Sequence, residues 1–191
     1  DFALMRVIPG MTVLCPCDAN EMRLAVEALL NYEGPAYMRL GRLAVDNITP
    51  EIEGYKFELG KGAVLKEGSD VTLIATGLMV QRAVRAAELL KEKGVSAEVI
   101  DMHTIKPLDE ELVLASARKT GAVVVSEEHS IIGGLGSAVA DFLAGTYPVP
   151  VIRHGVNDSF GRSGKAEEVL SLYGLTAEVM AEKAMKAISM K

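Results

Sequence analysis

Hydrophobic and polar positions along the chain follow two alternating patterns. Short apolar runs are typical of strands in a sheet that is covered on both faces. Between them lie segments with apolar residues three and four positions apart, which predicts helices. The predicted strands cover residues 11–15, 36–40, 71–76, 95–102, 122–126 and 150–153, with a shorter strand within 61–70. The predicted helices cover residues 21–30, 78–93, 108–119, 133–143, 165–173 and 177–190.

Capping residues support this assignment. Asp18 or Asn20 is placed to cap the first of these helices, and Gly94 and Gly121 are placed to end two others. Strand and helix alternate along the chain, which predicts the α/β class with a mainly parallel open sheet flanked by helices.

The first fifty residues differ from the rest. Residues 1–6 have the pattern of the last turns of a helix broken by Pro9-Gly10, and the chain begins without Met, so we expect sequence upstream. The polar stretch Asp46–Tyr55 is rich in breakers and predicts a boundary. We therefore expect a remnant of a second α/β domain in residues 1–50 and the main domain in 51–191. Strand partners would be missing near residues 11–14, so an apolar face should be partly exposed there.

Charge and composition exclude several classes of protein. With 20 Lys and Arg against 26 Asp and Glu, the net charge is −6, and no basic run is present, which argues against a nucleic-acid partner. No apolar stretch approaches the ~20 residues of a membrane span. Cys15 and Cys17 are too few for a disulfide framework. We expect a cytoplasmic protein.

Two candidate sites lie between residues 127 and 136. The turn Gly133–Gly136 precedes a helix, where an anion would meet free N–H groups, but it lacks the full dinucleotide fingerprint, so close helix–strand packing is favoured. His129 follows Glu127 and Glu128, which would raise the pKa of a general base. A histidine that only orders the loop is the favoured alternative.

The other candidates have ordinary explanations. His103 and His154 lack metal-ligand spacing, and Cys15-Pro16-Cys17 is not a Cys-x-x-Cys motif, so structural roles are favoured. The segment 160–165 is either a basic anion loop or a turn that starts a helix, and the turn is favoured.

Two arginines flank the end of the second predicted strand. Side chains alternate along a strand, so Arg39 and Arg42 should face opposite sides. Arg42 follows Gly41 at the carboxyl end of the sheet, where ligands of open α/β sheets bind. Its guanidinium suits phosphate, and a surface salt bridge is the alternative.

Several motifs in one order resemble a known family over nearly the whole chain. Residues 6–21 and 34–42 are similar to the end of the pyrimidine-binding domain of thiamine-diphosphate enzymes, in its transketolase form. Residues 60–109, 126–138 and 160–176 resemble the transketolase C-terminal domain. The deoxyxylulose-phosphate synthases are close neighbours, but their arginine strand usually ends Tyr-Pro-Arg-Gly rather than Leu40-Gly41-Arg42, and they usually have His in place of Ser163.

The resemblance implies the C-terminal section of a transketolase, a transferase of the pentose phosphate pathway that moves a two-carbon ketol unit between sugar phosphates. Thiamine diphosphate and a divalent metal, Mg or Ca, would belong to the complete enzyme and not to this chain. The expected partners are an N-terminal transketolase subunit or domain, a second copy in a homodimer, and sugar phosphates. Arg42 is the one position that carries over, as the substrate-phosphate ligand. No catalytic, cofactor-binding or metal-binding residue is expected here, so the chain alone should be inactive.

Three other functions stay open. The chain could belong to a deoxyxylulose-phosphate synthase. It could be a free-standing domain that only dimerises or docks a partner. It could also be a ligand-regulated domain that binds an anion at the turn Gly133–Gly136.

Overall fold

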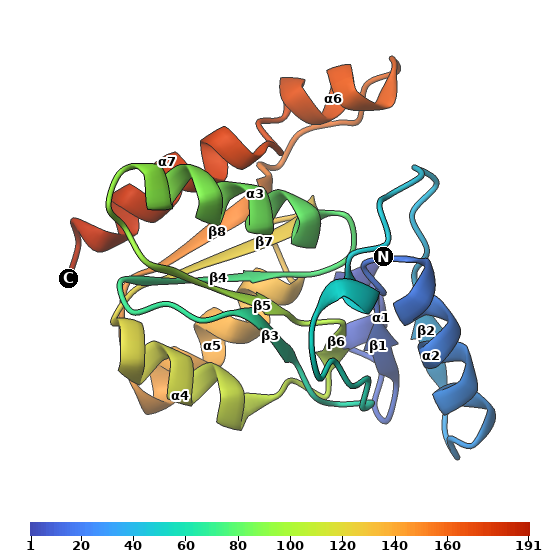
Figure 1. Ribbon diagram of the computed structural model, residues 1–191. Helices are drawn as coiled ribbons and strands as arrows, with labels where there is room; N and C mark the ends of the chain where they lie inside the picture. Colours follow the sequence, from blue (N-terminus) through green and yellow to red (C-terminus); the bar gives the residue numbers. More distant parts are fainter.

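Two β-sheets organise the chain, and helices cover both faces of the larger sheet (Figure 1). The computed structural model describes residues 1–191. The strands are β1 (Thr12–Leu14), β2 (Ala36–Met38), β3 (Ala63–Lys66), β4 (Val71–Ala75), β5 (Ala97–Asp101), β6 (Thr104–Lys106), β7 (Val123–Ser130) and β8 (Val151–Val156). The helices are α1 (Phe2–Arg6), α2 (Ala19–Leu30), α3 (Met79–Glu92), α4 (Glu110–Thr120), α5 (Leu135–Thr146), α6 (Ala166–Leu172) and α7 (Ala177–Ile188), with a 3-10 turn, η1 (Thr49–Glu51).

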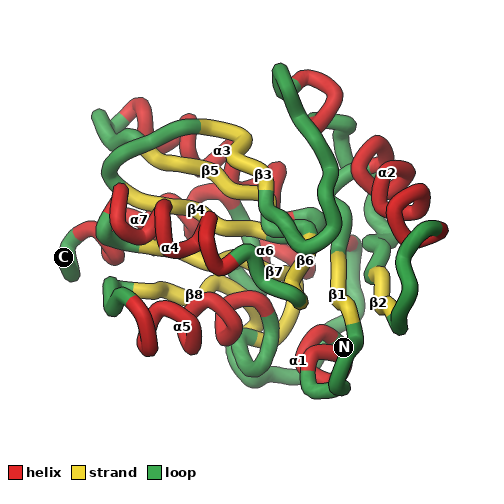
Figure 2. Tube along the Cα trace, turned by 90° about the horizontal axis from the view of Figure 1, so that it is seen from below, coloured by secondary structure: helices red, strands yellow, loops and turns green.

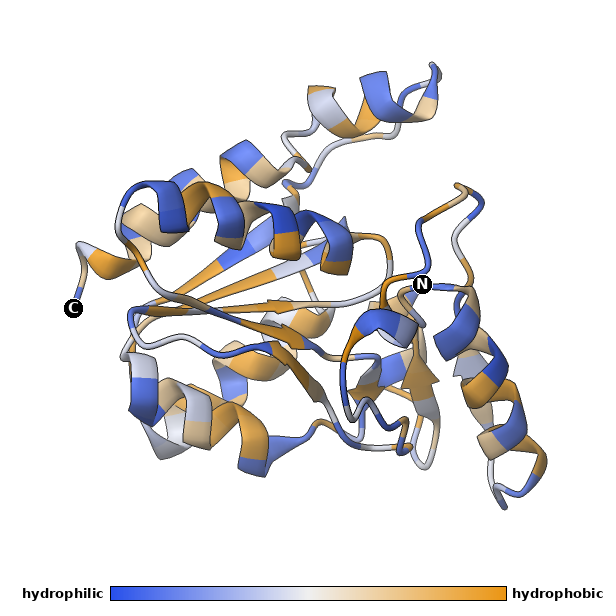
Figure 3. Ribbon diagram, viewed as in Figure 1, coloured by the Kyte–Doolittle hydropathy of each residue, from blue (hydrophilic) through white to orange (hydrophobic).

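The larger sheet has the strand order β3-β5-β4-β7-β8, and only β3 runs antiparallel to its neighbour. Helices α3 and α7 pack on one face, and α4 and α5 pack on the other. Every residue of β4 is buried, because both faces of the sheet are covered. Apolar residues accordingly gather on the strands and on the sheet-facing sides of the helices (Figure 3). The predicted α/β class with a mainly parallel sheet is confirmed.

The smaller sheet has the order β2-β1-β6 (Figure 2). Strand β1 pairs parallel with β2 and antiparallel with β6, which comes from the later part of the chain. Sequence reasoning missed β6, because three residues before a proline carry too little pattern to predict a strand. Strand β6 joins the first fifty residues to the rest of the chain.

The expectation of an exposed apolar face at residues 11–14 is wrong for the strand itself. Strand β1 is the central strand of its sheet, and Val13 and Leu14 are fully buried. The edge strands of this sheet are β2 and β6. Exposed apolar side chains lie on the neighbouring helix α2, where Leu30 is 80% exposed.

Capping follows the sequence expectation. Asp18 caps α2: its Oδ1 accepts a hydrogen bond from the Glu21 amide at 2.8 Å, and its Oδ2 accepts one from the Thr49 amide at 2.7 Å. Gly121 ends α4 with φ +67°, a left-handed conformation that favours glycine. The predicted bounds differ by two or more residues at several ends. Among them, β7 extends to Ser130, β8 extends to Val156, and α5 covers Leu135–Thr146 rather than 133–143.

The stretch Asp46–Tyr55 contains η1 and is anchored at buried Thr49. The division into residues 1–50 and 51–191 stays a prediction. None of the helices is long and apolar enough to cross a membrane.

Candidate functional site: a basic pocket at the strand ends

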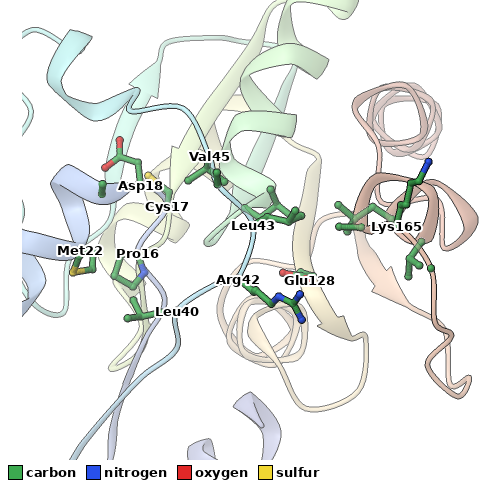
Figure 4. A pocket seen from close by; sticks show the side chains of 18 of the residues that line it. Pro16, Cys17, Asp18, Met22, Leu40, Arg42, Leu43, Val45, Glu128 and Lys165 are labelled. Atoms are coloured by element: carbon green, nitrogen blue, oxygen red, sulfur yellow. The ribbon is translucent and has the colours of Figure 1, made fainter.

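A pocket of about 970 Å³ lies between the two sheets, where the carboxyl ends of several parallel strands meet. The segment 40–45 after β2 forms one wall, and the segment 162–166 after β8 forms another. Leu78 after β4 and Glu128 in β7 also line the pocket. Figure 4 shows the side chains of Arg42, Glu128 and Lys165 in it.

The pocket borders the point where the connecting helices change from one face of the larger sheet to the other. The chain leaves β4 through α3 on one face of the sheet and leaves β7 through α5 on the other, so these neighbouring strands form a topological switch point. The loop after β1 packs into this point. The Cys15 carbonyl accepts hydrogen bonds from the Gly77 amide and from Thr76 Oγ1, both at 3.2 Å. A Cβ on Gly77 would lie 2.6 Å from Cys15 Sγ, so only glycine fits here. The rest of the pocket, beyond this packed loop, opens towards Arg42.

Arg42 is exposed in the pocket and forms no hydrogen bond or ion pair. Arg162 and Lys165 reach the same pocket from the opposite wall, and Arg162 is also unpaired. The structure therefore brings together two cationic segments that sequence analysis treated separately. The opposing carboxylate is Glu128, and the guanidinium of Arg39 lies 3.9 Å from it.

Arg39, unlike Arg42, has partners within the chain. Its Nε lies 3.2 Å from the Asp1 carboxylate, and its Nη1 donates a hydrogen bond to the Glu128 carbonyl at 2.7 Å. The guanidinium also lies 4.9 Å from the ring centre of Phe2. These contacts hold α1 against β7 and leave Arg42 as the free guanidinium.

The glycine-rich turn is closed by a side chain of the protein itself. The two carboxylate oxygens of Glu127 accept hydrogen bonds from the Leu135 and Gly136 amides, each at 2.8 Å. A Cβ on Gly134 would lie 1.9 Å from Glu127 Oε2. Close packing is thus the correct interpretation of the turn, and an anion site there is wrong, because Glu127 already fills the N-terminus of α5.

His129 does not have the environment of a general base with a raised pKa. Burial lowers its pKa, although its Nδ1 donates a hydrogen bond to the Ser130 carbonyl at 2.7 Å. Its ring packs 5.1 Å from the ring of Phe2. The expected effect of the neighbouring carboxylates is wrong. Glu127 Oε2 lies 3.7 Å from Nδ1, but burial and the positive charges of the N-terminus, Arg39 and Arg6 lower the pKa.

The remaining histidines are buried, as expected for structural roles. His154 Nε2 donates to the Gly174 carbonyl at 2.7 Å, and its Nδ1 lies 3.0 Å from Ser126 Oγ. His103 stacks on Phe57 with ring centres 4.3 Å apart. Burial lowers the pKa of both imidazoles.

Both thiols are buried, and burial raises the pKa of Cys15 to about 12. Cys17 belongs to a cluster that sequence analysis missed. Its sulfur, a Glu21 carboxylate oxygen and an Asp101 carboxylate oxygen lie within 4.8 Å of one another. Only the fold brings residues 21 and 101 together. The sequence carries no signal for the cluster, because burial of Glu21 is visible only in the structure.

Comparison with known proteins places this geometry in a family. Residues 60–180 match the family described as transketolase, C-terminal domain. The match covers more than half of the chain, so the chain belongs to the transketolase C-terminal domain family.

Individual relatives agree with this assignment. The chain is 47% identical over 191 residues to a 6-deoxy-6-sulfo-D-fructose transketolase subunit of Clostridium sp. (strain MSTE9), covering 100% of this chain and 59% of that protein. It is 38% identical over 179 residues to 1-deoxy-D-xylulose-5-phosphate synthase 1 of Geobacter sulfurreducens, covering 93% of this chain and 28% of that protein. A solved structure of a split-gene transketolase, an inactive β4 tetramer, superposes with a TM-score of 0.95 at 49% identity, covering 100% of this chain and 62% of that one. The chain spans about three fifths of the length of its nearer relatives.

Proposed function

We propose that this chain is the C-terminal part of a transketolase, which transfers a two-carbon ketol unit between sugar phosphates. In this proposal the chain supplies architecture and a substrate-binding arginine, Arg42, and no catalytic residue. The observation that carries it is the free guanidinium of Arg42 at the strand ends of a transketolase-family fold.

The surroundings of Arg42 favour an anionic group. A guanidinium binds a phosphate through two parallel hydrogen bonds, and Arg42 has no carboxylate partner to compete. Arg162 and Lys165 add positive charge to the pocket. One relative is named for 6-deoxy-6-sulfo-D-fructose, which carries a sulfonate. A guanidinium can bind either a phosphate or a sulfonate, so an assay has to show which of the two anions this pocket binds.

Thiamine diphosphate and its divalent metal do not fit the residues of this chain. The helix N-terminus that could cradle a diphosphate is occupied by Glu127. The cluster of Cys17, Glu21 and Asp101 is buried and includes a thiol, whereas Mg²⁺ takes oxygen ligands and keeps several waters. In the proposal, the cofactor is therefore held by an N-terminal subunit or domain, and no chemical step is assigned to this chain.

A partner subunit and self-association are part of the same proposal. Exposed apolar residues on α1 and α2, among them Leu4 and Leu30, lie beside the open edge of β2 and would be covered in an assembly. The related split-gene structure is described as an inactive β4 tetramer, which supports self-association of this section without turnover. We propose a homodimer with the N-terminal subunit bound, in the cytoplasm, where both thiols stay reduced.

Two alternative functions are less well supported. A deoxyxylulose-phosphate synthase is favoured only by matches at lower identity, and Leu40-Gly41-Arg42 and Ser163 depart from its usual motifs. A domain that only dimerises would need no free arginine in a pocket.

Reconstitution tests the proposal. The chain is mixed with an N-terminal transketolase subunit, thiamine diphosphate and Mg²⁺, and ketol transfer from a sugar phosphate is followed. We expect turnover by the mixture and none by either part. A complex that forms, as shown by light scattering, but transfers no ketol group would contradict the proposal. Formation of deoxyxylulose phosphate from pyruvate would favour the synthase.

A further inference from the structure

A buried acidic cluster lies where the first fifty residues meet the larger sheet. Cys17 precedes α2, Glu21 lies in its first turn, and Asp101 is the last residue of β5. Their candidate ligand atoms, one sulfur and two carboxylate oxygens, all lie within 4.8 Å of one another, and all three residues are buried. No basic side chain forms an ion pair with either carboxylate.

Asp101 is the unusual member. It is 0% exposed, and neither of its carboxylate oxygens has a hydrogen-bond partner. Glu21, by contrast, accepts hydrogen bonds from the Cys17 amide at 2.6 Å and from the Tyr55 hydroxyl. Buried carboxylates are normally paired, hydrogen-bonded or bound to a metal, so the free oxygens of Asp101 point to a missing partner within this cluster.

We propose that Cys17, Glu21 and Asp101 bind a divalent cation of the zinc type. Zinc takes thiolate, carboxylate and imidazole ligands, and a single thiolate with two carboxylates leaves one place in its usual four-coordinate shell for water. A hard cation such as Mg²⁺ is less suited to the thiolate. Metal ligands of these types bind in their deprotonated forms, so the cation would compensate the negative charge of the cluster.

The site has a route to solvent and a structural consequence. Cys17 also lines the pocket that contains Arg42, so an ion can approach from there (Figure 4). The ligands come from the start of α2 and the end of β5. A bound ion therefore cross-links the first fifty residues to the larger sheet, independently of ketol transfer.

Cobalt substitution tests the site directly. The purified chain is stripped with a chelator, dialysed and titrated with Co²⁺, whose thiolate bond gives a charge-transfer band in the near ultraviolet. We expect the band at one equivalent, and its loss in Cys17→Ala. Cys15→Ala is the matched control, because this second buried thiol lies outside the cluster, and it should keep the band.

A second variant separates binding from folding. Asp101→Asn keeps the shape of the side chain and removes its charge, and it should weaken Zn²⁺ affinity at least tenfold by competition with a zinc dye. Zinc should raise the melting temperature of the wild-type chain and leave that of folded Asp101→Asn unchanged. No uptake of Zn²⁺ or Co²⁺ at micromolar concentration by the folded wild-type chain would overturn the proposal. A band retained in Cys17→Ala would also overturn it.

Discussion

Arg39 and Arg42 lie three residues apart on the segment that leaves β2, and only Arg39 is paired. Arg39 contacts Asp1, Glu128 and the ring of Phe2, whereas Arg42 enters the pocket without a partner. The paired arginine stabilises the fold, and the free one is available to a ligand.

This contrast predicts different effects on stability. Arg39→Ala should lower the free energy of unfolding by about 1–2 kcal/mol, because a half-buried ion pair and a cation–π contact are lost together. Arg42→Ala should change it by no more than about 0.5 kcal/mol, as is usual for a surface substitution. Urea denaturation measures both values. Equal destabilisation by the two substitutions would show that Arg42 has a structural partner.

The packing of Glu127 against the turn before α5 predicts opposite effects for two glycines. Gly134→Ala should cost about 1–3 kcal/mol, because its Cβ would displace the Glu127 carboxylate and leave two buried amides unsatisfied. Gly145→Ala, near the end of the same helix with no atom within 4 Å of the new Cβ, should stabilise by about 0.4–1 kcal/mol. Thermal unfolding measures the stability of both variants. A Gly134→Ala variant as stable as the wild-type chain would exclude the Glu127 carboxylate as the cap of α5.

The three histidines predict a loss of stability in mild acid. Burial lowers the pKa of His103, His129 and His154 in the folded chain. As the pH falls below about 6.5, the unfolded chain takes up protons first, so unfolding becomes more favourable until the folded-state pKa values are passed. Urea denaturation from pH 8 to pH 5 should show this decline. Imidazole resonances that titrate at or above pH 6.5 would contradict it.

The closed helix N-terminus predicts that the isolated chain does not bind the cofactor. Calorimetric titration of thiamine diphosphate with Mg²⁺ into the chain alone should give no heat of binding, because Glu127 occupies the helix N-terminus that could hold a diphosphate. Saturable micromolar binding would mean that the division of roles between this chain and its partner is wrong.

Sequence patterns predicted the larger sheet and its helices well, because β4 and α3 have strong local periodicity. They also predicted a cap at Asp18 or Asn20, and the structure has it at Asp18. The role of Arg42 as a phosphate ligand stays a prediction. They missed β6, whose strand depends on pairing with β1, and the cluster of Cys17, Glu21 and Asp101, which only the fold assembles. The role of Glu127 was also hidden, since nothing local shows that its carboxylate turns back onto the amides of Leu135 and Gly136.

The kinetics of Arg42 variants test the central claim most directly. In the reconstituted enzyme, Arg42→Ala should raise the KM for a sugar phosphate roughly 10- to 100-fold, since a charged hydrogen-bonded contact is worth about 1.5–3 kcal/mol. The KM for the matching unphosphorylated sugar should not change, and Arg42→Lys should recover part of the loss. A 6-sulfo sugar assayed beside the phosphate shows which anion the pocket prefers. An equal loss for phosphorylated and unphosphorylated sugars, or no loss for either, would contradict the assignment of Arg42 as the anion ligand.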